Sequence, residues 1–296
     1  MKGLSPVLHS AVTIMTPILL AATGGLFTEL AGFLNIALEG LLLVGAFSAI
    51  AAAFYTGSFA AGLFAAISAS LLISALLAFS TLKLRSNVFI AGLAVNLLAG
   101  GLTVVLSHYF FNTKGVIIFQ SDKSIPLVNI PFVKHIPVIG DLFSGHSVYV
   151  YASWLLLVCS WIAIYKTSFG YRLRACADHS MALASLGLRP DTYRWTAFLL
   201  SGFFCGIGGS FLSLNLSVFV PNMTAGKGWI ALVVIFLGGR KPQGLLLAAF
   251  VFGLADTLSN YAQGLRNVPA DFILAMPYLL TLLAIVLVSV WGKRKS

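Results

Sequence analysis

Apolar residues recur along this chain in runs of roughly 20 residues, separated by short polar segments. Such a run is long enough to cross roughly 30 Å of hydrocarbon as a helix. The runs lie near residues 9–27, 35–56, 60–81, 87–108, 147–166, 194–214, 243–260 and 271–291. Because no polar block is large enough for a second domain, the pattern predicts a single transmembrane domain over residues 1–296, an all-α, polytopic helical bundle.

Two segments break the helical pattern within apolar surroundings. Residues 216–238 contain a proline and two glycines before an apolar run that is too short to span a bilayer, and Asn35 and Glu39 interrupt the start of another run. Irregular backbone at membrane depth survives only where protein or water satisfies its hydrogen bonds, and paired broken helices are typical of transport pathways. We therefore expect broken or re-entrant helices near 32–45 and 221–232 to line a solute route.

The composition and charge fit a membrane protein. Of 296 residues, 59% are apolar and 9% are charged, against about 45–50% and 25% in soluble domains. The net charge of +10 comes from basic residues that gather at the ends of the predicted spans on one side, which the positive-inside rule makes cytoplasmic. This placement explains the charge without nucleic acid, and it puts the loop at 112–146 outside and the basic loop at 167–193 inside. Counted back from a cytoplasmic C-terminus, nine membrane crossings place Met1 outside, whereas ten place it inside.

Few polar side chains lie within the apolar runs, so each is a candidate for function. A carboxylate at membrane depth costs at least about 2.5–3.5 kcal/mol, so Glu39 and Asp256 should face the protein interior, a cavity or an interface. They could belong to a solute or proton path; alternatively, Glu39 caps a half-helix and Asp256 joins helices through a hydrogen bond. Asn96 is open to the same two interpretations, contact with solute or a bond between helices.

Aromatic residues at expected membrane boundaries complete the pathway candidates. Trp229 and the cluster 109–111 are typical of an aromatic belt, although they could also stack on a flat ring. The candidate residues of the translocation pathway are Asn35, Glu39, Asn96, Met223, Trp229 and Asp256.

Catalytic, nucleotide-binding and metal-binding motifs are missing from the sequence. Lys227 follows a glycine, but it lacks the Ser or Thr that a phosphate loop requires after the lysine. The five histidines and three cysteines show no ligand spacing. We expect a transport component without enzymatic activity and without a cofactor or metal of its own.

The loop at 167–193 contains one amphipathic helical segment. Asp178 or Ser180 can cap a short helix that stops at Gly187. The segment could rest on anionic lipid headgroups, or it could dock into the groove of a cytoplasmic partner.

Three blocks of the sequence resemble the permease subunits of bacterial ABC importers. They are LFTELAGFLNIALEG at 26–40, FGYRLRAC at 169–176, and the stretch 226–256, which begins GKGWIAL. The likeness runs from about residue 10 to 290 and is narrower for the branch that serves simple sugars, nucleosides and riboflavin, within the branched-chain amino acid and ribose permease superfamily. Members often carry an arginine where Leu30 stands, so Glu29 lacks that partner here.

The resemblance implies a set of partners in the bacterial cytoplasmic membrane. They are a second permease, homologous or identical, two ATP-binding cassette subunits that hold ATP and Mg, and an extracytoplasmic substrate-binding protein. It also implies that the helix at 170–190 is a coupling helix inserted into an ATPase subunit. The residues expected to couple to that ATPase are Arg172, Arg174, Asp178, His179, Met181, Leu183, Leu186, Gly187 and Arg189.

These observations predict an ATP-driven importer permease for a small, largely uncharged solute, and the resemblance implies a nucleoside or riboflavin. A simple sugar is the alternative substrate. Two other classes of protein remain as rivals. One is a proton-coupled secondary carrier that uses Glu39 and Asp256, and the other is a membrane scaffold without transport.

Overall fold

A computed structural model describes residues 4–119, 125–128 and 139–262 of the protein. The described chain is a helical bundle, and seven of its helices are long and apolar enough to cross a membrane. These helices are α1 (Leu4–Leu30), α2 (Leu38–Thr56), α3 (Phe59–Ala78), continued by the π-helix η1 (Phe79–Lys83), α4 (Val88–Phe111), α6 (Val148–Lys166), α9 (Pro190–Leu216) and α11 (Pro242–Ala262). The predicted all-α polytopic bundle is confirmed, while the run at 271–291 lies outside the described residues.

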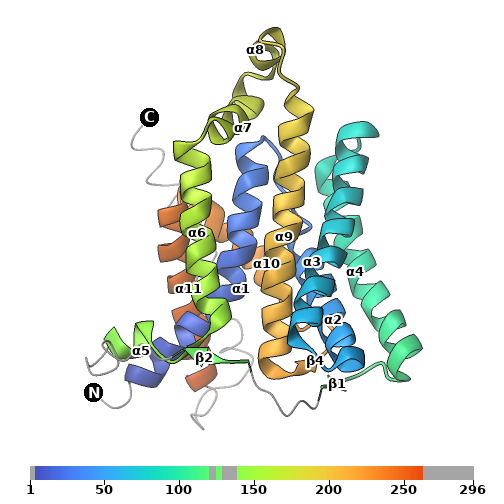
Figure 1. Ribbon diagram of the computed structural model, residues 1–296, viewed down its shortest axis with the longest axis vertical. Helices are drawn as coiled ribbons and strands as arrows, with labels where there is room; N and C mark the ends of the chain where they lie inside the picture. The colour runs from blue at the N-terminus through green and yellow to red at the C-terminus, as the bar shows by residue number, and fades with distance from the viewer. Residues whose placement is uncertain (1–3, 120–124, 129–138, 263–296) are drawn as a thin grey trace.

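The two ends of the bundle carry different connections (Figure 1). At one end, α7 (Ser168–Asp178) and α8 (Ser180–Ser185) project beyond the long helices. At the other end lie the start of α1, the short helix α5 (Ile139–Phe143) and short strands. Strand β1 (Ile117–Ile118) pairs antiparallel with β4 (Val218–Phe219), and β2 (Leu127–Val128) pairs antiparallel with β3 (His146–Ser147). The described residues of the segment 112–146 thus include short strands and one short helix.

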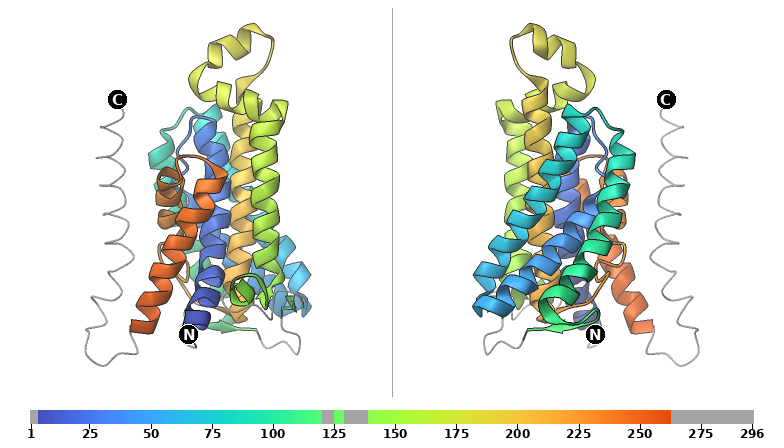
Figure 2. Two further views of the ribbon diagram at one scale, coloured as in Figure 1. Left: turned by 90° about the vertical axis from the view of Figure 1, so that its left-hand side faces the viewer. Right: turned by 90° about the vertical axis from the view of Figure 1, so that its right-hand side faces the viewer.

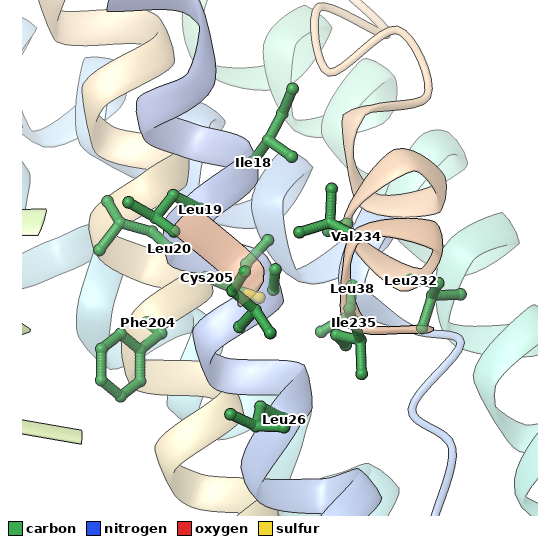
Figure 3. Close-up of a cluster of buried hydrophobic side chains, with 14 of the residues drawn as sticks. Ile18, Leu19, Leu20, Leu26, Leu38, Phe204, Cys205, Leu232, Val234 and Ile235 are labelled. Carbon is green, nitrogen blue, oxygen red and sulfur yellow. The ribbon is translucent and has the colours of Figure 1, made fainter. Parts of the chain in front are cut away.

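Helices α1 and α9 form the centre of the bundle, and α9 packs against α1, α2 and α3. Glycines on α9 allow this close packing: a Cβ added at Gly206 would lie 2.7 Å from the Cα of Ile67 on α3. A cluster of buried apolar side chains joins the central helices (Figure 3), with Leu26 on α1, Phe204 on α9, Leu38 on α2 and Ile235 on α10 (Lys227–Leu237). Between membrane-spanning helices, such a cluster stabilises the fold through van der Waals packing, because lipid tails are as apolar as these side chains.

The outer helices keep apolar side chains on the surface. On α4, for example, Leu97 is 80% exposed and Ile90 is 70% exposed. A water-soluble protein rarely exposes apolar patches of this extent, so this face is suited to lipid or to another membrane subunit. Figure 2 shows α4 on the outside of the bundle, away from α6 and α7.

Candidate translocation site and projecting loop

The chain breaks between α1 and α2, inside the bundle. After α1 it turns at Gly32, whose φ of +90° favours glycine, and α2 begins only at Leu38. Asn35 holds the break: its side-chain Oδ1 accepts the N–H of Ala37 at 3.0 Å, and its Nδ2 donates to Ser201 Oγ on α9 at 2.9 Å. The side chain is buried, so these bonds also satisfy an amide that would be costly to leave unpaired.

Asn96 on α4 holds the same break from the opposite side. Its Oδ1 accepts the N–H of Gly40 at 2.8 Å, and its Nδ2 donates to the carbonyl of Ile36 at 3.0 Å. The first N–H groups of a helix have no hydrogen-bond partner within the helix. Asn96 supplies such a partner to the N–H of Gly40, near the start of α2. The interhelical interpretation of Asn96 therefore describes its observed contacts.

The second broken segment leads into α10, a helix of 11 residues that also begins within the bundle (Figure 1). Its N-terminal cap is Gly226, with a φ of +81°, and the preceding turn holds Asn222 and Ala225 at positive φ. The carboxylate of Glu39 closes this helix start, because Oε1 accepts the N–H of Gly226 at 2.9 Å and Oε2 accepts the N–H of Gly228 at 2.6 Å. A negative charge at a helix N-terminus is further stabilised by the helix dipole.

Glu39 therefore links the two half-helices. It lies in the first turn of α2 while its carboxylate caps the first turn of α10. The two backbones also touch, since a Cβ added at Gly228 would collide with the backbone N and Cα of Glu39. Of the two interpretations of Glu39, capping is the one that its contacts display, and the bonds span 187 and 189 residues of sequence.

The remaining pathway candidates are less tightly connected. Met223 packs against the apolar cluster around Phe219. Trp229 is 41% exposed near the start of α10. Asp256 on α11 is half-buried and makes no hydrogen bond or ion pair with the residues that the structure describes.

Glu29 has a partner that the sequence did not reveal. Arg240, in the turn between α10 and α11, places Nη2 2.8 Å from Glu29 Oε1 at the end of α1. The Glu29 side chain is 11% exposed, and that of Arg240 is 57% exposed. Arg240 is thus the positively charged partner of Glu29, and it comes from a part of the chain far from Leu30.

The projecting loop folds as two helices, where the sequence predicted one. Thr167 caps α7, accepting the N–H of Gly170 at 3.4 Å through its side-chain oxygen. The N-terminal cap of α8 is His179, without a side-chain cap bond, so neither Asp178 nor Ser180 caps a helix as expected. The end of this segment agrees with the sequence, since Gly187 follows α8 with a φ of +76°.

The apolar residues of α8 and its C-cap point in different directions. Met181 is 88% exposed and Leu186 is 78% exposed, whereas Leu183 is only 4% exposed and packs inward. An exposed pair of large apolar side chains beyond the end of a membrane bundle offers a contact for a protein partner. Asp178, His179, Gly187 and Arg189 are also exposed.

The two arginines of α7 make contacts within the protein. Arg172 Nη1 donates to the hydroxyl of Tyr193 at 3.1 Å. The guanidinium of Arg174 lies 5.0 Å from the ring centres of both Tyr165 and Tyr171. Beside them, burial raises the pKa of the Cys176 thiol, while the positive charge of Arg194 opposes that shift.

The sequence matches a known family along almost its whole length. The family model described as the permease component of branched-chain amino acid transport systems covers residues 7–289. The chain belongs to this permease family. The nucleoside ABC transporter permease NupC of Lactococcus lactis is 31% identical to this permease, over 92% of the chain and 88% of NupC. The guanosine ABC transporter permease NupQ of Bacillus subtilis is 32% identical, over 95% of the chain and 91% of NupQ.

A solved structure supports the fold. An inward-facing metal-chelate type ABC transporter aligns with 95% of the chain, which covers 85% of that protein, with a TM-score of 0.55 and 17% identity. As an ABC importer permease with seven membrane-length helices among its described residues, the protein is a multi-pass component of the bacterial cytoplasmic membrane. Permeases of this kind are transport components that act with ATPase and binding-protein partners.

Proposed function

We propose that this permease carries nucleosides into the cell, powered by ATP hydrolysis on partner subunits. The relatives NupC and NupQ are named for nucleoside and guanosine transport and match the chain over more than nine-tenths of its length. The observation that carries the proposal is the junction of α2 and α10 at Glu39, two broken helices that meet inside the bundle. Such half-helix junctions are typical of solute sites in transporters.

The charges at the junction favour an uncharged solute. The Glu39 carboxylate is occupied by two N–H groups of α10, and Lys227, between these two glycines, brings one positive charge to the same turn. One negative and one positive side chain leave the junction close to neutral. A nucleoside is itself uncharged, so its passage would add no charge to the junction.

The contacts of Glu39 also count against a proton-coupled carrier. A proton relay requires a carboxyl group that gains and loses a proton in each cycle, and protonation of Glu39 would weaken the two bonds that hold α10. The same carboxylate would then be both a structural cap and a moving charge. The ATP-driven mechanism makes no such demand on it.

In the proposed assembly, α7 and α8 dock into a cytoplasmic ATPase subunit. Met181 and Leu186 supply exposed apolar contacts, and the flanking arginines complement an acidic rim. This permease would have no ATPase activity or cofactor of its own: two ATP-binding cassette subunits bind ATP and Mg, a second permease completes the pore, and an extracytoplasmic protein delivers the solute.

The substrate test uses the assembled importer in proteoliposomes with ATP inside. Radiolabelled guanosine, adenosine, uridine, riboflavin and ribose are offered in turn, each with the cognate binding protein outside. We expect ATP-dependent accumulation of nucleosides, at least tenfold above riboflavin and ribose. Accumulation of riboflavin or ribose in preference to every nucleoside would overturn the assignment of substrate.

The docking test replaces the two exposed apolar side chains. Met181→Glu with Leu186→Glu should abolish co-purification of the ATPase subunits, while the permease keeps its thermal stability because neither side chain is buried. The matched control is Ile118→Glu with Leu127→Glu, which adds the same two charges at apolar sites that are 60% and 66% exposed on the opposite end. Undiminished ATPase binding by the double variant would contradict docking through α8.

A further inference from the structure

Arg194, near the start of α9, connects the projecting loop to the broken segment before α2. Its Nη2 donates to the carbonyl of Cys176, in the last turn of α7, at 3.1 Å. Its guanidinium also lies 5.4 Å from the ring centre of Phe33, which follows the turn at Gly32. Both contacts are favourable, because a positive charge is stabilised by the dipole at a helix C-terminus and by the face of an aromatic ring.

A second contact ties the same two segments together. A Cβ added at Gly32 would lie 3.2 Å from the Cα of Ala177, so the backbone of the turn rests directly against α7. The φ of +90° at Gly32 holds the turn in a conformation that other residues rarely adopt. Two contacts therefore join α7 to this turn, one through the Gly32 backbone and one through the Arg194 side chain.

The contacts continue from this turn to the half-helices. Phe33 packs on Phe198 of α9, with ring centres 5.7 Å apart, and two residues later Asn35 bonds Ser201 of the same helix. Asn35 in turn accepts the N–H of Ala37 at the start of α2, whose first turn carries Glu39. An unbroken series of contacts thus runs from the projecting loop to the cap of α10.

The Arg194 side chain is 23% exposed. Its Nη1 lies 3.4 Å from Oδ1 of Asp191, which is 63% exposed. An exposed ion pair of this kind contributes little to stability. The interactions that distinguish Arg194 are therefore those with α7 and Phe33.

We propose that Arg194 is a positioning residue that transmits movement of α7 and α8 to the segment 31–37, and so ties solute passage to ATP hydrolysis. The inference rests on the proposed function. It assigns to Arg194, which contacts neither solute nor ATP in this role, control over how many solute molecules cross for each ATP consumed.

The experiment measures nucleoside uptake and ATP hydrolysis in the same proteoliposomes with the complete importer. Arg194→Gln removes the charge and should lower uptake per ATP at least fivefold, while hydrolysis stays within twofold of the unaltered complex. Phe33→Leu should lower the same ratio, and adding it to Arg194→Gln should lower the ratio no further, because both changes interrupt one link. Arg194→Lys keeps a cation near Phe33 and should restore part of the ratio.

Controls separate this role from a structural one. Lys166→Gln removes an exposed cation at the end of α6 and should leave the ratio unchanged. If Arg194→Gln fails to assemble, Phe33→Leu decides, since it keeps an apolar side chain. An unchanged ratio in assembled Arg194→Gln or Phe33→Leu complexes overturns the role of Arg194 alone. Absence of ATP-driven uptake by the unaltered complex overturns the proposed function itself.

Discussion

The carboxylate of Glu39 accepts the backbone N–H of Gly228 at 2.6 Å, across 189 residues of sequence. One residue on α2 thereby closes the open start of α10, and two helices that are each broken become a single unit. A helix start at membrane depth must find a partner in the protein or in water, because lipid offers none to its N–H groups.

Neutralising this cap should destabilise the permease. Glu39→Gln keeps the shape but turns an amide NH₂ towards an N–H donor, and the loss of a charged hydrogen bond with an unpaired buried donor costs about 2–3 kcal/mol. Thermal unfolding in detergent, followed by tryptophan fluorescence, should show a lower midpoint. Asp178→Asn, which neutralises an exposed acid, should leave the midpoint in place. Equal midpoints for Glu39→Gln and the unaltered protein would refute the cap.

The close approach at Gly228 yields a second prediction. Gly228→Ala places a methyl group against the backbone of Glu39, and overpacking of this kind costs typically about 1–3 kcal/mol. We expect poor yield of folded permease and a lowered unfolding midpoint. Gly101→Ala on α4, where no atom lies within 4 Å of the added Cβ, serves as the control and should behave like the unaltered protein. Similar behaviour of the two variants would contradict the described junction.

Removal of the Asn96 amide should loosen the start of α2. Asn96→Leu leaves the N–H of Gly40 and the carbonyl of Ile36 without their partner, at about 1–3 kcal/mol for each unpaired group. Thr103→Val, on the same helix, loses a bond only to carbonyls of its own helix and should cost less than about 1 kcal/mol. Hydrogen exchange should increase at residues 36–40 in Asn96→Leu and not in Thr103→Val. Unchanged exchange at these residues would show that Asn96 does not hold them.

Exchanging the two charges tests the ion pair between Glu29 and Arg240. Glu29→Lys or Arg240→Glu alone brings like charges together, and the double variant restores attraction. Because Arg240 is more than half exposed, the effect on unfolding should not exceed about 1 kcal/mol. It should also shrink at high salt. Recovery of less than half of the lost stability in the double variant would argue against a direct pair.

Much of the fold could be predicted from the sequence, because a membrane-spanning helix is recognisable from the length and hydropathy of its apolar run. All the predicted spans within the described residues correspond to helices, and the glycines around residue 226 marked the second break correctly. The two-helix form of the projecting loop was not foreseen, since the turn at His179 carries no glycine or proline.

The contacts of the site were much harder to foresee. The sequence offered capping as one role for Glu39, but not its recipient, because Gly226 and Gly228 lie in the other half of the chain. Arg240 and Arg194 were visible only as basic residues near span ends. Their partners, Glu29 and Phe33, come from a segment brought close by tertiary packing.

The most direct test of the account compares solute accumulation by proteoliposomes that hold equal amounts of permease, with and without the ATPase subunits. With the ATPase subunits and ATP inside, we predict accumulation of labelled nucleoside that stops when ATP is withheld. Without them, we predict no accumulation under any pH gradient. Concentrative uptake by the permease without its ATPase subunits would contradict the account.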